Sequence, residues 1–169
     1  MIPHMRLPLL ITLTLALTAC GTSDPKALTD QGSRALAAGD NKSALESFDQ
    51  ALAKLDPKSP EFLRASMGHV QARARQDQTR AKDEFLDFVR AHSDKVTEQD
   101  YNMIVGELVK KGAVAPATEI IEAGLKTFPE SPNMKKLRDL VGDAAKKSKD
   151  PKAINTLKGL GYAGSDESR

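Results

Sequence analysis

Apolar and polar residues follow a helical period along most of this chain. Between residues 27 and 161, apolar side chains recur at intervals of three and four positions. Such spacing gathers them on one face of an α-helix, and the same segments are rich in Ala, Leu, Lys, Glu and Gln, which favour helices. No stretch of the sequence shows the sustained alternation typical of a β-strand. The pattern therefore predicts an all-α protein.

Turn and capping residues divide this region into eight predicted helices. Gly39-Asp40 separates a helix over 27–38 from one over 43–55. Ser59 and Pro60 suit the N-cap and first position of the third helix, and Thr97 with Asp100 resembles a capping box. The other predicted breaks lie at Gln76-Asp77, Gly112, Pro129 and Pro132. Tight connections alternate with proline-bearing ones, which predicts a chain of antiparallel helical hairpins.

An internal repeat runs through these hairpins. The repeated elements are Ala44-x3-Phe48, Ala81-x3-Phe85 and Ala117-x3-Ile121. Successive alanines are 37 and 36 residues apart, and each lies five residues after a predicted turn. The chain resembles the tetratricopeptide (TPR) family, whose repeats of about 34 residues carry an A-x3-F element in their second helix. The resemblance covers residues 27–161, with 132–161 expected to form an irregular closing hairpin.

The resemblance implies a right-handed solenoid of about three to four antiparallel helical hairpins. Small side chains at Ala44, Ala81 and Ala117 are expected to let paired helices approach closely. The resemblance also implies a concave groove, lined by the first helix of each hairpin, in which a protein partner binds. The residues expected to line this groove are Ser66, Val70, Arg73, Asn102, Val109 and Lys110.

The first 19 residues have the organisation of a secretory signal peptide. Arg6 is followed by the apolar run Leu7–Leu17, which has the length of a signal-peptide core and is too short to span a bilayer. A buried helix and an uncleaved signal anchor are the alternatives. Neither explains why the single cysteine of the chain, Cys20, comes directly after this run.

Leu17-Thr18-Ala19-Cys20 resembles the lipobox of bacterial lipoproteins. The resemblance implies cleavage before Cys20, lipidation of its thiol and acylation of the new amino terminus. Several acyl chains hold a protein on a membrane far better than one. Residues 20–26 are then a short tether, and Gly21, in place of an aspartate, points to the outer membrane and its periplasmic face.

Composition narrows the possible partners. The 25 basic and 23 acidic residues nearly cancel, so the broad basic field of a nucleic-acid-binding protein is missing from the sequence. The final third carries many lysines, interrupted by Asp139, Asp143 and Asp150. A solvated capping face is favoured there over a surface for an acidic partner or anionic lipid. Residues 162–169 are expected to form a flexible tail.

Candidate catalytic chemistry is sparse in the sequence. Only His69 and His92 remain after removal of the signal peptide, and neither has further ligands at the spacing of a metal site. Motifs of serine nucleophiles and phosphate-binding loops do not occur. We therefore expect no enzyme activity, no metal or other cofactor and no small-molecule substrate. The predicted function is that of a membrane-anchored periplasmic adaptor or assembly lipoprotein. The alternative is a structural envelope protein or accessory subunit that spaces a complex without capturing a peptide.

Overall fold

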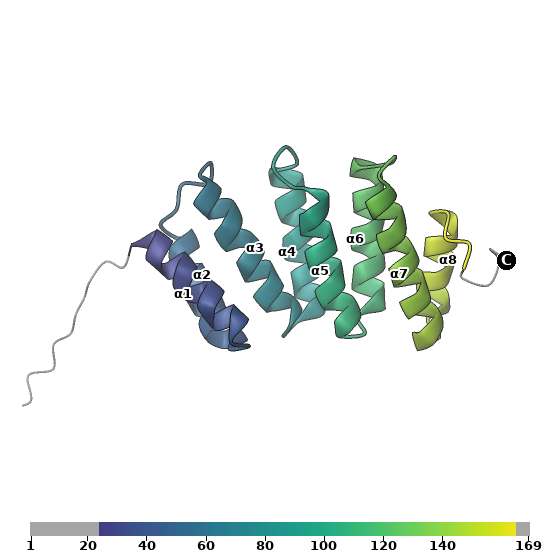
Figure 1. Cartoon of the computed structure of the whole chain (residues 1–169), viewed down its shortest axis with the longest axis horizontal. Helices are drawn as coiled ribbons and strands as arrows, with labels where there is room; N and C mark the ends of the chain where they lie inside the picture. The colour runs from purple at the N-terminus through teal and green to yellow at the C-terminus, as the bar shows by residue number, and fades with distance from the viewer. Residues whose placement is uncertain (1–23, 165–169) are drawn as a thin grey trace, which may run out of the picture.

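The computed structural model describes residues 24–164, which form eight α-helices and no strand (Figure 1). The helices are α1 (Pro25–Ala37), α2 (Asn41–Leu52), α3 (Pro60–Ala74), α4 (Gln78–Ala91), α5 (Glu98–Lys110), α6 (Val114–Thr127), α7 (Pro132–Ser148) and α8 (Pro151–Gly159). The predicted all-α class and the chain of antiparallel hairpins are confirmed. None of the helices in the described range is long and apolar enough to cross a bilayer.

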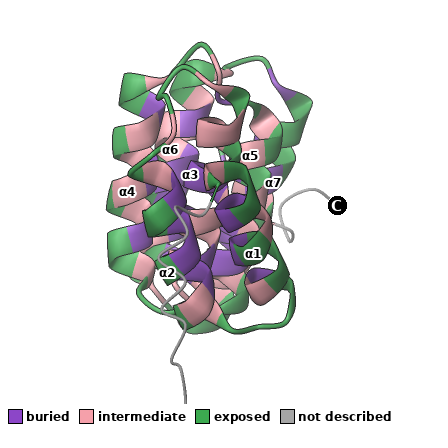
Figure 2. Ribbon diagram, turned by 90° about the vertical axis from the view of Figure 1, so that its left-hand side faces the viewer, coloured by how far each residue is buried: buried purple, intermediate pink, exposed green. Residues whose placement is uncertain are grey.

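The hairpins stand side by side along the long axis of the molecule (Figure 1). Each odd-numbered helix packs against the next odd-numbered one, from α1 through α3 and α5 to α7. On the other side, α4 packs against α6 and α6 against α8. Viewed along the array, α2, α4 and α6 lie on one side and α1, α5 and α7 on the other, with buried residues between them (Figure 2). The protein therefore has an odd-helix face and an even-helix face.

Short polar side chains precede every described helix except α6, which follows Ala113. Ser59 accepts a hydrogen bond from the Phe62 N–H at 3.1 Å, and Asp100 accepts one from the Thr97 N–H at 2.8 Å. Such caps satisfy N–H groups that have no partner within the helix. The tight turn before α6 contains Gly112, whose φ of 69° is the left-handed conformation that glycine adopts without strain. The predicted breaks at these positions are confirmed.

The repeated alanines lie in the core of the array. Ala44, Ala81 and Ala117 are fully buried, as are the bulky side chains Phe48 and Phe85 that follow two of them. A methyl side chain allows two helix backbones to come together, and the aromatic ring fills the space towards the next helix. The prediction that these alanines are buried is confirmed.

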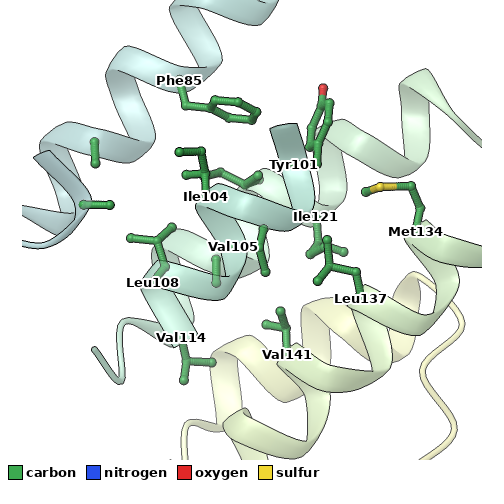
Figure 3. Close-up of a cluster of buried hydrophobic side chains, with 14 of the residues drawn as sticks. Phe85, Tyr101, Ile104, Val105, Leu108, Val114, Ile121, Met134, Leu137 and Val141 are labelled. Carbon is green, nitrogen blue, oxygen red and sulfur yellow. The ribbon is translucent and has the colours of Figure 1, made fainter. Parts of the chain in front are cut away.

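The hydrophobic core divides at α3. One cluster joins α1 and α2 to Ala65 and Ala72 of α3. The second starts from Met67, Val70 and Ala74 on other sides of α3 and continues to the C-terminal end of the array (Figure 3). Because α3 contributes to both clusters, it joins the first hairpin to the rest of the protein.

The ends of the folded region differ slightly from the predicted boundaries. The helical region was expected to start at residue 27, but α1 begins at Pro25, with Asp24 as its N-cap. Tyr162 was assigned to the flexible tail, yet it is buried and donates a hydrogen bond to Asp143 at 2.8 Å. Its ring packs over Gly142, where the lack of a side chain leaves room for it. The predicted signal peptide, Cys20 and the remaining tail residues 165–169 lie outside the described residues.

Candidate partner-binding groove

A groove runs over the odd-helix face between α1, α3 and α5, with a volume of about 570 Å³. We call it the α3 groove. Its walls combine six apolar side chains with five polar ones, which are Ser33, Arg64, Gln71, Arg75 and Asp100. The apolar lining residues are Leu36, Ala37, Pro60, Leu63, Met67 and Met103. Methionine is flexible and polarisable, so a surface that contains two of them adapts to apolar groups of different shapes.

The charged residues at the margin of the α3 groove have partners within the chain. Arg64 forms an ion pair with Asp30 across α3 and α1. Asp100 accepts hydrogen bonds from the N–H and the hydroxyl of Thr97, both at 2.8 Å. Arg75 pairs with Glu107 at 3.0 Å. Since both arginines are neutralised by carboxylates and Asp100 is already hydrogen-bonded, the α3 groove suits an uncharged apolar ligand better than a charged one.

Arg75 ties three odd-numbered helices together at one end of the α3 groove. Its guanidinium donates to the Leu36 carbonyl of α1 at 2.9 Å and to the Glu107 carboxylate of α5 at 3.0 and 3.3 Å. Gln71 donates to the same carboxylate at 3.2 Å. Glu107 is only 8% exposed, so these bonds satisfy a carboxylate that burial would otherwise destabilise.

The pKa of Glu107 follows from this arrangement. Burial alone raises the pKa of its carboxyl, but hydrogen bonds from Arg75 and Gln71 and the charges of Arg75 and Lys110 outweigh burial. The pKa therefore lies below its ordinary value. The ionised form of Glu107 is the one that holds α3 and α5 together.

A second groove of about 710 Å³ lies on the same face, where α5 meets α7. Its lining includes the amide side chains of Gln99, Asn102 and Asn133, and Asn133 donates to Glu98 at 3.0 Å. Leu140, which is 47% exposed, lies at its edge. The odd-helix face thus offers an apolar groove on one side of α5 and an amide-lined groove on the other.

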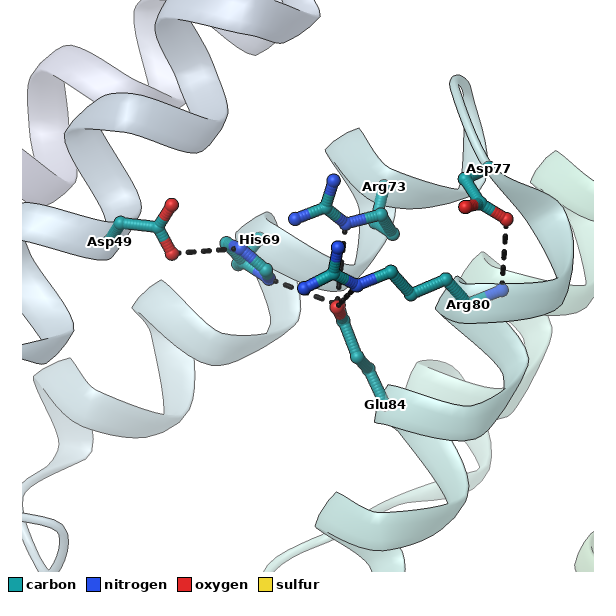
Figure 4. A network of polar contacts seen from close by, with 6 residues as sticks. All are labelled: Asp49, His69, Arg73, Asp77, Arg80 and Glu84. Carbon is teal, nitrogen blue, oxygen red and sulfur yellow. Dashed lines mark hydrogen bonds and ion pairs between the residues drawn. The ribbon is translucent and has the colours of Figure 1, made fainter.

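Three residues expected to line the groove lie elsewhere on α3. Ser66 and Val70 are buried, and Val70 belongs to the core shared with α4. Arg73 points to the even-helix face, where its Nε lies 3.4 Å from Glu84 (Figure 4). None of these three residues lines the α3 groove, because they lie on other sides of the α3 axis than the residues that do. The groove face of α3 instead carries Leu63, Arg64, Met67, Gln71 and Arg75.

The three residues expected on α5 are dispersed. Asn102 lines the amide-lined groove. Val109 is half-buried and packs against the core, while Lys110 is exposed and lies 3.8 Å from Glu107. Sequence reasoning missed Met103. This residue comes directly after Asn102, and nothing in the sequence pattern distinguishes it as a groove residue.

A polar network occupies the opposite side of α3, on the even-helix face (Figure 4). His69 lies between Asp49 of α2 and Glu84 of α4, and Glu84 also meets Arg73 and Arg80. Burial raises the pKa of Glu84, but the hydrogen bond and charge of His69 and the charges of both arginines outweigh burial and leave it below its ordinary value. His69, which showed no metal-site spacing in the sequence, is the centre of an ion-pair cluster.

His92 lies in the connection after α4, where its ring contacts Phe62 and Phe88 at centroid distances of 5.8 and 4.6 Å. Within residues 24–164, His, Asp and Glu side chains form no group of three that is suited to a metal ion. Of the two grooves on the odd-helix face, the α3 groove is the smaller and the more apolar, and this lining suits the binding of an apolar segment. Comparison of the chain with known protein families, with curated proteins and with solved structures gave no match.

Proposed function

We propose that this protein is a membrane-anchored adaptor of the bacterial envelope that binds an uncharged, apolar segment of a partner protein in the α3 groove. The observation that carries the proposal is the apolar lining of the α3 groove between three helices, with every charged lining residue paired inside the chain. The TPR resemblance supports a binding role for this face, because repeat arrays present extended surfaces to their partners.

The proposed anchor rests on the lipobox-like sequence that ends at Cys20. Five residues, Cys20 to Asp24, lead from the expected acylated thiol to the first residue of α1. So short a tether keeps the array next to the bilayer. The adaptor then acts on partners at the membrane surface, and we propose the periplasmic face of the outer membrane.

The energetics favour an apolar ligand. Full burial of a Leu, Met or Phe side chain contributes about 1.5–3 kcal/mol, so apolar anchors in the α3 groove are the contacts that offset the cost of association, which is about 4–15 kcal/mol. A charged ligand gains little there, because Arg64, Arg75 and Asp100 would have to give up their present partners. An amphipathic segment with its apolar side turned to α3 fits these requirements.

Site-specific photo-crosslinking in intact cells tests the proposal. A photoreactive residue at Met103, in the α3 groove, is expected to give a defined adduct with one partner protein. The matched position Gln50, exposed on α2 of the even-helix face, is expected to give none. Mass spectrometry of the adduct should locate the crosslink in an apolar segment of the partner.

A groove variant supplies the second arm of the experiment. Ala37→Glu places an unpaired carboxylate in the groove wall and is expected to remove a partner crosslink formed from Met103. Lys42→Glu, on exposed α2 surface, should leave it in place. Circular dichroism and thermal melting verify that both variants remain folded. Equal labelling from Met103 and Gln50, or an adduct that survives Ala37→Glu, contradicts the proposal. Absence of any adduct supports a spacer that captures no segment.

A further inference from the structure

The last hairpin of the array, α7 with α8, is strongly basic. Residues 132–161 carry eight basic and three acidic side chains, a net charge of +5, whereas residues 24–131 carry 15 basic and 18 acidic ones, a net charge of −3. This hairpin forms the end of the array opposite to α1 and α2 (Figure 1). Although the total charge of the chain is small, one end of the molecule is positive.

The three aspartates of this hairpin have partners within the C-terminal region. Asp139 forms an ion pair with Arg138 at 2.7 Å. Asp143 accepts a hydrogen bond from the Tyr162 hydroxyl at 2.8 Å, and Asp150 caps the first turn of α8. The aspartates that interrupt the lysine run in the sequence are therefore occupied by an arginine, a phenol and a backbone N–H.

Three lysines lie within six residues at the turn between α7 and α8, and we call them the turn lysines: Lys147, Lys149 and Lys152. All three are exposed, and within residues 24–164 none of them forms an ion pair. They line neither groove of the odd-helix face. The turn lysines thus present positive charge to the surroundings at a place separate from the α3 groove.

Lys149 has a backbone conformation that lysine rarely adopts. Its φ is 54°, and within residues 24–164 it is the one residue other than glycine with a positive φ. The turns before α2 and α6 have Gly39 and Gly112 at the same position, with φ values of 81° and 69°. In all three turns the N–H of the next residue donates to the carbonyl five positions before it, at 2.9, 2.9 and 3.1 Å.

Glycine is the residue that adopts this conformation without steric cost, and it is the usual choice after a helix end. A lysine in its place strains the turn before α8, although two other turns of the same chain avoid that strain. Backbone strain of this kind persists where the side chain has a use. The use that lysine offers and glycine lacks is a positive charge.

We propose that the turn lysines bind the anionic headgroups of a phospholipid bilayer and form a second membrane contact at the end of the array opposite to α1. The inference rests on the proposed lipid anchor, which brings the array to a bilayer. Clusters of lysines beside a membrane attachment bind anionic lipids, and two attachments hold a protein on a membrane far better than one. With a contact at each end, the long axis of the array lies along the bilayer.

An anionic bilayer fits the turn lysines better than an acidic segment of a protein does. A lysine presents a compact, strongly hydrated charge on a flexible stem, and all three stems are exposed. Because the turn lysines line neither groove of the odd-helix face, an acidic segment bound to them would lack the walls of those grooves. Lipid headgroups need no such walls, since each one moves within the bilayer to meet a charge.

Vesicle sedimentation tests the second contact. The full chain carrying Cys20→Ser, which has no thiol to acylate, is mixed with vesicles of phosphatidylcholine alone or of phosphatidylcholine with one third phosphatidylglycerol. We call the ratio of the two binding constants, anionic over neutral, the charge preference. Each lysine near an anionic surface strengthens binding by about fivefold, so the turn lysines together should raise the charge preference by about one hundredfold. Added salt should lower it, because such attraction is screened.

Two triple variants separate the turn lysines from net charge. Lys147→Glu, Lys149→Glu and Lys152→Glu together should lower the charge preference by about one hundredfold or more. The matched variant changes three exposed lysines elsewhere in the array and should keep the parent's preference: Lys42→Glu, Lys58→Glu and Lys111→Glu. The apolar N-terminal run is the same in all samples. A parent without a charge preference, or equal losses in the two triple variants, overturns the proposal.

Lys149→Gly is the sharpest single substitution. It should melt at or above the temperature of the parent, because glycine relieves the strain at this position, yet its charge preference should fall by about fivefold. An unchanged preference in Lys149→Gly contradicts the role of the strained lysine. Since the vesicle assay uses a chain without the acylated thiol, its result is independent of lipid labelling at Cys20 and of crosslinking from Met103, which test the anchor and the groove.

Discussion

The ring of Phe48 on α2 lies directly against the backbone of Gly68 on α3. A Cβ at Gly68 would stand 2.4 Å from Cζ of Phe48, closer than two carbon atoms can approach. The same ring meets Gly32 of α1, where a Cβ would stand 2.7 Å from Cε1. Two glycines thus form the slot that allows the phenylalanine of one helix to join three helices in the N-terminal core.

Gly68→Ala should destabilise the protein by about 1–3 kcal/mol, because the ring of Phe48 has to leave its position and disturb a fully packed core. Urea unfolding followed by circular dichroism measures the change. Gly106→Ala in α5 is the matched control, since nothing lies within 4 Å of a Cβ there. It should raise stability by roughly 0.5–1 kcal/mol through the helix preference of alanine. Equal effects of the two substitutions would contradict the slot.

Ala81→Leu should also cost about 1–3 kcal/mol through overpacking, since Ala81 is fully buried where α4 meets its neighbours. The expected result is a lower melting temperature with retained helicity. Ala115→Leu, on the exposed side of α6, serves as the control and should melt close to the parent. Unchanged melting of Ala81→Leu would show that this alanine does not set a close helix contact.

Glu107→Gln should make stability less sensitive to acid. The pKa of Glu107 is lower in the folded protein than in the unfolded chain, where it is about 4.3. Its stabilising contribution is therefore complete above the unfolded value and is lost as the pH falls through the folded one. Unfolding free energies at pH 7, 5, 4 and 3 measure this loss. Between pH 5 and pH 3 the parent should lose more stability than the Gln variant. Glu46→Gln, exposed on α2, should follow the parent.

Cys20→Ser should abolish incorporation of a palmitate analogue and release the protein from the membrane fraction, because the lipobox-like sequence offers no other thiol to acylate. Ala19→Gly, which keeps a small residue before the proposed cleavage point, should still be labelled. Persistent label in Cys20→Ser would refute the lipid anchor.

The sequence by itself determined the extent of the helices and the turns that join consecutive helices. Capping side chains such as Ser59, and turn glycines such as Gly112, act within a few residues, so the boundaries of the helices can be inferred from local sequence. The repeated alanines could be recognised for a similar reason. Ala81 lies at a fixed distance from its turn, and that distance decides which side of the helix meets its partner within the hairpin.

Only the tertiary structure decided which side of α3 faces the groove. The α3 helix packs on more than one side, since Ala72 packs towards the first hairpin and Val70 packs towards α4. Apolar residues therefore occur all around it. Successive residues are about 100° apart around the axis. An error of one residue in the assigned face is therefore enough to place Arg73 in the groove when it lies on another side of the helix. The pair Arg75–Glu107 joins α3 to α5 and the pair His69–Asp49 joins α3 to α2, so each depends on how two separate helices lie against each other. Side-chain charge and spacing along one helix contain no information on that neighbour, so these pairs follow from packing alone.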